Sequence, residues 1–94
     1  MKRPVFVQAL PGYVLHLRYD DGVEGDVDVS AFVGTAPFRP WNDLAFFQCV
    51  HIGPHREIRW NDDIELCPDS LYMQITGMTP ENYFAEMALE PLHA

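Results

Sequence analysis

Basic residues are scarce in this sequence, which contains 6 Lys and Arg residues against 14 Asp and Glu residues and has a formal net charge of −8. A surface with this charge repels the phosphate backbone of nucleic acids, so we expect no direct contact with DNA or RNA. The acidic balance suits contact with a basic protein partner, and it equally serves to keep a small domain in solution.

Cysteine is also scarce, and long apolar runs are absent. Cys49 and Cys67 are too few for a disulfide scaffold, so we expect free thiols in a reducing compartment. No apolar run approaches the length of a membrane span. The proline and glycine at positions 11 and 12 interrupt the N-terminal apolar stretch before it reaches the length of a signal-peptide core. These features predict a cytoplasmic protein without membrane contact.

Internal repeats, low-complexity tracts and linkers are missing as well. The 94 residues are 48% hydrophobic and 13% aromatic, which provides enough apolar surface for one packed core. The sequence therefore predicts a single domain over residues 1–94.

Alternating apolar residues dominate the N-terminal half of the sequence. Residues 5–10 are rich in β-forming side chains, residues 13–19 alternate between apolar and polar, and residues 23–29 resume the alternation. The last two segments are joined by a polar turn that contains Gly22. Glycine suits such a turn because it tolerates a positive φ. The pattern predicts a three-stranded antiparallel meander.

The middle of the sequence predicts a second β-hairpin. Residues 47–52 alternate, and residues 57–60 return as the partner strand after a Gly-Pro turn. Single helical turns are expected at 31–33 and 42–46, with a proline-containing loop at 35–41 between them.

Two helices are predicted after the second hairpin. The run that begins at Pro68 follows helical spacing, and Gly77 marks its end. The last helix, at about 80–90, has the clearest start signal in the sequence, with Thr79 as the N-cap and Pro80 at the first helical position. Together these elements predict an α+β fold with antiparallel hairpins, short helices and one C-terminal helix.

A series of short motifs follows a definite order along the chain. They are Tyr19-Asp20-Asp21-Gly22, Gly25-Asp26-Val27-Asp28-Val29-Ser30, Phe38, Phe47, Ile58-Arg59-Trp60 and Pro68-Asp69-Ser70-Leu71-Tyr72. The closing stretch is the most specific, because a polar turn and an acidic residue separate the tryptophan at a strand end from Pro-Asp-Ser-Leu-Tyr. Over roughly residues 5–75, this order resembles the prokaryotic domain-of-unknown-function family 2442 (DUF2442).

The resemblance implies an α+β fold with an antiparallel sheet, and it implies no enzyme activity. Members of this family are often encoded beside another small domain, in arrangements that look like toxin and antitoxin pairs. The sequence departs from the family pattern where Asp63 replaces a usual glycine and Glu65 replaces a usual aspartate, so no role is carried over to Glu65. Some relatives carry an additional C-terminal helix-turn-helix. Because this sequence ends after one helix, we expect that DNA binding does not transfer.

Two groups of side chains have the chemistry of metal ligands. Asp26 and Asp28 alternate along a predicted strand, and their oxygens suit a hard cation such as calcium. Cys49, His51 and His55 offer sulfur and nitrogen ligands for zinc or copper, and the second cysteine could complete this set. Neither spacing matches an established metal motif, so we predict a solvated strand face and packing roles in place of a metal site.

Motifs for catalysis and cofactor binding are not found. The sequence contains no glycine-flanked serine nucleophile, no catalytic cysteine signature and no phosphate-binding glycine loop. Carboxylates at positions 62, 63, 65 and 69 gather near Trp60, but a carboxylate-rich turn is normally solvated. His16 and His93 have no partner that the sequence identifies, so we assign them no role. We therefore predict no catalytic residue and no cofactor.

Large residues in or beside loops are the remaining candidates. Phe38, Arg39, Trp41 and Trp60 have the composition of an interaction hot spot, although a small domain must bury most of its aromatic residues. We expect a non-catalytic, antitoxin-like protein-interaction module whose partner is another small protein encoded by a neighbouring gene. The alternatives are a metal-binding or hydrolytic protein, and a self-associating domain that forms homodimers through exposed strand edges.

Overall fold

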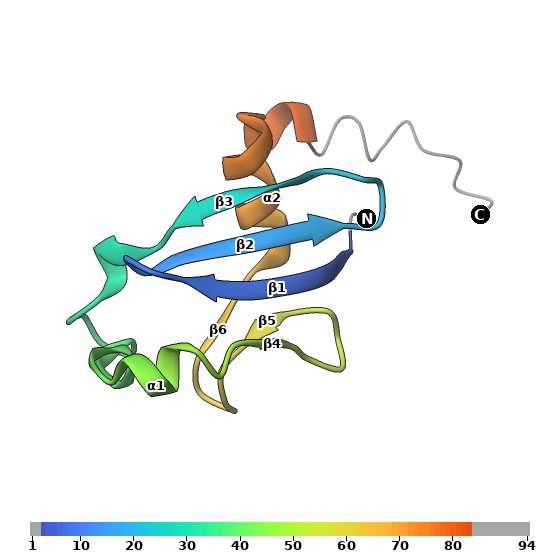
Figure 1. Cartoon of the computed structure of the whole chain (residues 1–94). Helices are drawn as coiled ribbons and strands as arrows, with labels where there is room; N and C mark the ends of the chain where they lie inside the picture. The colour runs from blue at the N-terminus through green and yellow to red at the C-terminus, as the bar shows by residue number, and fades with distance from the viewer. Residues whose placement is uncertain (1–2, 84–94) are drawn as a thin grey trace.

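Two antiparallel three-stranded sheets and a few short helices make up the fold. The computed structural model describes residues 3–83 of the chain (Figure 1). The first sheet contains, in spatial order, β1 (Pro4–Leu10), β2 (Val14–Tyr19) and β3 (Glu24–Asp28). The second sheet contains, in spatial order, β4 (His51–Ile52), β5 (Ile58–Arg59) and β6 (Glu65–Leu66). The predicted α+β class with antiparallel hairpins is confirmed.

The first sheet is the predicted meander, and its register follows from the alternation of side chains. Leu15 pairs with Val27 and Leu17 pairs with Gly25, so the apolar residues of β2 and β3 share one face. Leu15 and Leu17 are fully buried on this face. Gly22 has a φ of 91° in the turn between the two strands, which is a conformation that glycine adopts without strain.

Three short helical segments connect the two sheets. They are η1 (Ser30–Phe32), η2 (Arg39–Asn42) and α1 (Leu44–Phe47). The Asp43 carboxylate accepts a hydrogen bond from the Ala45 amide at 3.0 Å and so caps the start of α1. The helical turns predicted near 31–33 and 42–46 are therefore present, whereas the segment predicted as a loop at 35–41 runs into η2.

The second sheet differs from the predicted hairpin in two respects. The prediction of a strand over residues 47–52 is wrong for residues 47–50, because α1 extends to Phe47 and a turn follows it. In addition, β6 pairs antiparallel with β5, which makes a third strand where the sequence indicated only a segment after a turn. Strands of two residues are too short to show an alternating pattern, so their number could not be read from periodicity.

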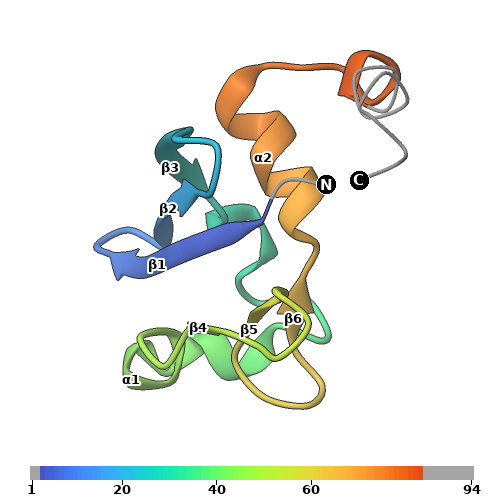
Figure 2. The same ribbon diagram turned by 90° about the vertical axis from the view of Figure 1, so that its right-hand side faces the viewer.

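Helix α2 (Pro68–Thr76) packs against the inner face of the first sheet (Figure 2). It begins with Pro68 at its first turn and ends at Gly77, whose φ is 74°, as the sequence predicts. Helix and sheet approach closely at Gly25, because a Cβ atom there would lie 2.7 Å from Cγ2 of Ile75. The absence of a side chain at this position allows α2 to lie against β3.

The predicted C-terminal helix is described only in its first turn. Residues 80–83 are helical, and the Thr79 hydroxyl oxygen accepts a hydrogen bond from the Asn82 amide at 3.2 Å. This contact is the predicted N-cap. The remainder of the helix predicted to reach about residue 90 lies outside the described residues.

The core lies between the two sheets and α2. Its buried side chains are Leu15, Leu17, Tyr19, Val27, Val29, Trp41, Phe47, Ile58, Trp60, Ile64, Leu71, Tyr72 and Tyr83. Tyr19 donates a hydrogen bond from its hydroxyl to the Pro68 carbonyl oxygen at 2.7 Å, which joins β2 to the start of α2. Burial raises the pKa of the Tyr19 hydroxyl. Within residues 3–83, no helix has the length and apolar character that a membrane span requires.

Candidate protein-interaction surface

A column of aromatic rings leads from the core to the surface. Trp60 lies 4.6 Å from Trp41 between ring centroids, Trp41 lies 4.7 Å from Phe38, and Phe38 lies 4.9 Å from Phe32. We call these four residues the aromatic column. Phe32 is 39% exposed at its outer end. Because each ring packs against the next, the exposed ring is held in place from behind.

The tryptophans predicted as interface residues are core residues. Trp41 is 0% exposed and Trp60 is 4% exposed, and the Trp60 indole donates a hydrogen bond to the Phe47 carbonyl oxygen at 2.8 Å. Neither side chain can present a contact surface in this fold, so this part of the prediction is wrong. The large apolar surface of an indole is buried first in a domain of this size, which has few other side chains able to fill its core.

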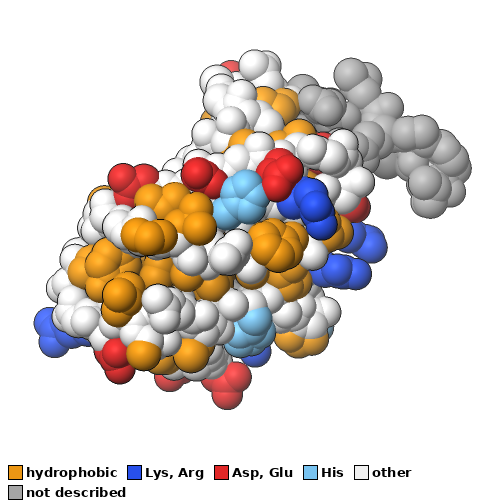
Figure 3. Space-filling view, in the orientation of Figure 1, with side chains coloured by type: hydrophobic (Ala, Val, Ile, Leu, Met, Phe, Trp, Pro, Cys, Tyr) orange, Lys and Arg blue, Asp and Glu red, His pale blue; other side chains and the backbone are white. Residues whose placement is uncertain are grey.

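The other two predicted interface residues lie at the surface end of the column. Phe38 is half-buried and Arg39 is exposed. Leu44, on the nearby α1, is 50% exposed. Figure 3 shows hydrophobic side chains gathered over the left-hand end of the molecule, where the turn between β1 and β2 and, below it, α1 lie in Figure 1. We call the set Phe32, Phe38, Arg39 and Leu44 the apolar end.

The outer face of the first sheet carries a histidine held between two carboxylates. His16 on β2 lies 2.6 Å through Nδ1 from an Asp26 carboxylate oxygen and 2.6 Å through Nε2 from a Glu24 carboxylate oxygen, both on β3. Both ring nitrogens can donate only when the imidazole is protonated. Hydrogen bonds to Asp26 and then to Glu24 raise the pKa of His16 above 6.5. The sequence-based assignment of no role to His16 is therefore corrected.

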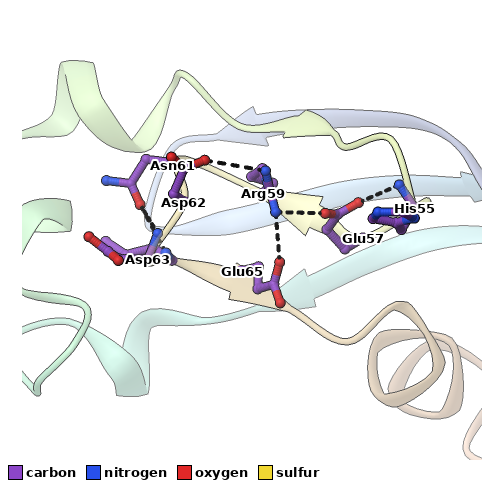
Figure 4. A network of polar contacts seen from close by, with 8 residues as sticks. His55, Glu57, Arg59, Asn61, Asp62, Asp63 and Glu65 are labelled. Carbon is purple, nitrogen blue, oxygen red and sulfur yellow. Dashed lines mark hydrogen bonds and ion pairs between the residues drawn. The ribbon is translucent and has the colours of Figure 1, made fainter.

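A second charged cluster surrounds Arg59 on the second sheet (Figure 4). Its guanidinium lies 3.0 Å from Glu57, 3.4 Å from Glu65 and 3.5 Å from Asp62. Burial of the Glu57 carboxylate opposes ionisation, but main-chain amides of Glu57 and His55, together with Arg59, hold the pKa of Glu57 below its ordinary value. Of the carboxylates predicted to gather near Trp60, Asp62 and Glu65 thus form ion pairs with Arg59, whereas Asp69 accepts a hydrogen bond from the Tyr83 hydroxyl at 2.6 Å.

The side chains of Cys49 and His51, two of the candidate zinc or copper ligands, are engaged in other contacts. Cys49 lies in the turn after α1 and donates from its thiol to the Ala45 carbonyl oxygen at 3.3 Å, so it does not share a strand face with His51. His51 contacts the Cys49 carbonyl oxygen, and the His55 amide donates to Glu57. Among residues 3–83, no group of three or more histidine, cysteine or acidic residues is arranged to hold a metal ion.

The aspartates of the proposed calcium set also have separate partners. Asp26 contacts His16, whereas Asp28 accepts a hydrogen bond from the Ser30 amide at 2.8 Å. Hydrogen bonds from Ser30 hold the pKa of Asp28 below its ordinary value. Of the two predicted clusters, neither is brought together as a ligand set. The histidine at position 93 lies outside the described residues.

The amino-acid sequence matches a known family over most of the chain. The family described as "Protein of unknown function (DUF2442)" matches residues 4–77. The chain belongs to the DUF2442 family. Among curated proteins, none matches the sequence. In a comparison with solved structures, this DUF2442 domain superposes on the crystal structure of a candidate DNA-binding protein of Nitrosomonas europaea with a TM-score of 0.73 and 24% identity.

This likeness establishes the fold alone. It covers 92% of the DUF2442 chain and 58% of the Nitrosomonas protein, so the chain spans little more than half the length of that relative. The family match confirms the resemblance that the ordered motifs indicate, including the closing Pro-Asp-Ser-Leu-Tyr stretch that opens α2.

Proposed function

We propose that this DUF2442 domain is a non-catalytic protein-interaction module that binds another small protein through the apolar end. The observation that carries the proposal is the exposure of Phe32 at the tip of the aromatic column, with Leu44 exposed nearby. An aromatic side chain already fixed by the rings behind it loses little conformational freedom on binding, which is a property of residues that dominate binding energies. Arg39 adds a charged side chain of a type enriched in such sites.

The proposed partner is a small protein encoded by a neighbouring gene, in an antitoxin-like arrangement in the cytoplasm. Support for this part comes from the family resemblance and from the net charge of −8, which favours association with a basic protein. A homodimer through the same surface is the alternative outcome.

DNA binding is not proposed for this chain, although the Nitrosomonas protein carries that designation. Six Lys and Arg residues against 14 acidic residues would repel a phosphate backbone. The likeness covers only part of that protein, so its designation does not pass to this segment.

Native mass spectrometry of the protein purified gently from its own host tests the proposal. Wild-type protein is expected to carry a stoichiometric partner of distinct mass, which sequencing then assigns to a gene. Phe32→Ser is expected to weaken the complex at least tenfold, corresponding to a loss of about 1.4 kcal/mol or more.

Phe6→Ser is the matched control, because Phe6 is 40% exposed and Phe32 is 39% exposed, and Phe6 lies on the first sheet. The proposal fails if the wild-type protein carries no partner, or if Phe32→Ser and Phe6→Ser retain the partner equally. A mass of two identical chains would support self-association instead.

A further inference from the structure

The free edge of β3 carries main-chain groups that no strand within residues 3–83 engages. The first sheet has the order β1-β2-β3, so β3 pairs with β2 on one side only. The Val29 amide donates to the Tyr13 carbonyl oxygen, and the Tyr19 amide donates to the Val23 carbonyl oxygen. Odd-numbered residues therefore point their main-chain groups toward β2. By alternation, the even-numbered residues of β3 point theirs outward.

The outward-facing residues of this edge are Glu24, Asp26 and Asp28. Their side chains lie on the exposed face of the sheet, where cross-strand neighbours would have Cβ atoms about 4.5–5.5 Å away. A strand added to this edge would place every second side chain beside one of these carboxylates. The side-chain spacing of the edge thus selects for basic residues at alternate positions.

We propose that the β3 edge is the docking site for an extended basic segment of the partner protein, which adds to the first sheet as a fourth strand. This inference rests on the proposed interaction function and adds a second contact region to it. Main-chain hydrogen bonds along the edge would supply affinity, and the alternating carboxylates would supply specificity for alternating Lys or Arg.

A second copy of the chain is a poor occupant of this edge. Pairing β3 with another β3 would set carboxylates against carboxylates, which is destabilising between directly opposed positions. The sequence also has no segment with basic residues at alternate positions, because its six are Lys2, Arg3, Arg18, Arg39, Arg56 and Arg59. The other edge strand of this sheet, β1, lies beside β4 (Figure 1). The charge pattern therefore requires a different protein.

His16 gives this edge a built-in reporter. Asp26 and Glu24 each reach from β3 to the His16 ring on β2, and their side chains remain 56% and 48% exposed. A lysine from an added strand would compete with the imidazolium for the same carboxylates. Binding of the basic strand must therefore lower the pKa of His16, because two equilibria that share a group are coupled reciprocally.

The test uses the isotope-labelled full chain and a short synthetic peptide in which lysine alternates with valine, monitored by NMR. The peptide is expected to slow hydrogen exchange of the Glu24, Asp26 and Asp28 amides and to lower the pKa of His16. A peptide with glutamate in place of lysine is expected to do neither. Asp26→Asn should weaken peptide binding by about two- to five-fold, as expected for one exposed ionic contact.

Asp62→Asn serves as the matched control, since it removes the same charge from the turn after β5, where the side chain is 99% exposed. The inference is overturned if the glutamate peptide binds equally well, if the three β3 amides gain no protection, or if the two asparagine variants weaken binding equally.

The outcome of this test separates the edge from the proposed function. If native mass spectrometry finds a protein partner while the β3 amides stay unprotected in the complex, the edge inference fails and the interaction function stands. If the lysine peptide protects the β3 amides while native mass spectrometry finds no partner, the result supports the edge inference and counts against the proposed function.

Discussion

Replacement of His16 by glutamine is expected to remove a pH-dependent contribution to stability. In the folded protein the imidazolium contacts Asp26 and Glu24 at 2.6 Å each, and its side chain is 27% exposed. Exposed ion pairs contribute about 0.2–1 kcal/mol each, so the two contacts together contribute about 1 kcal/mol. For a domain of this size, 1 kcal/mol corresponds to about 4–8 °C in Tm.

The sign of the effect follows from the direction of the pKa shift. The pKa of His16 is raised on folding, so the folded state holds the proton more tightly than the unfolded state does. The stabilisation is fully present below the unfolded-state pKa of 6.5 and is lost as the pH rises through the higher folded-state pKa. Wild type should therefore exceed His16→Gln in stability below pH 6.5, and the difference should vanish at alkaline pH.

Urea or thermal unfolding across this pH range measures the difference directly. His51→Gln is the control for the loss of a histidine, since the His51 ring contacts the Cys49 carbonyl oxygen and takes no part in the contacts with Asp26 and Glu24. If wild type and His16→Gln keep a constant separation at every pH, or if wild type gains stability relative to the variant as the pH rises, the argument is refuted.

Further substitutions test the packing of the core. Trp41→Ala is expected to lower the free energy of unfolding by about 3–5 kcal/mol, because the indole is fully buried; a loss below 1 kcal/mol would contradict its core position. Gly25→Val should lower the free energy of unfolding by about 1–3 kcal/mol, because the new side chain forces Ile75 away from β3. Ile75→Ala in the same chain should restore part of that loss, and additive effects of the two substitutions would exclude this contact. Tyr19→Phe should lower the free energy of unfolding in denaturant by about 1–2 kcal/mol, because the Pro68 carbonyl oxygen loses its donor. An unchanged midpoint of denaturant unfolding would argue against this hydrogen bond.

The first sheet could be predicted in detail because its sequence repeats one simple rule over three segments. Alternation and the glycine turn fix its register, and counting outward from that turn places His16 opposite Asp26. The contact between His16 and Asp26 is therefore encoded in the sequence, but only when His16 is read together with its cross-strand neighbours. Charged partners across a hairpin are found by register and not by distance along the chain.

The second sheet and the burial of the tryptophans could not be predicted in the same way. Each strand there has two residues, and the helical capping by Asp43 overrides the apparent alternation after residue 46. The burial of Trp41 and Trp60 depends on contacts between segments far apart in the sequence, which local patterns do not encode. The family match covers the fold but indicates no binding residues.

The contact between Trp41 and Trp60 also gives the protein an intrinsic optical probe. These are the only two tryptophans in the sequence, and their rings lie 4.6 Å apart at an angle of 48°. Two indoles at this separation share their electronic excitation, which produces a paired positive and negative band in circular dichroism. That band requires η2, which contains Trp41, to stay in contact with Trp60, the residue after β5. Its loss would report separation of these two segments even while the rest of the backbone keeps its secondary structure.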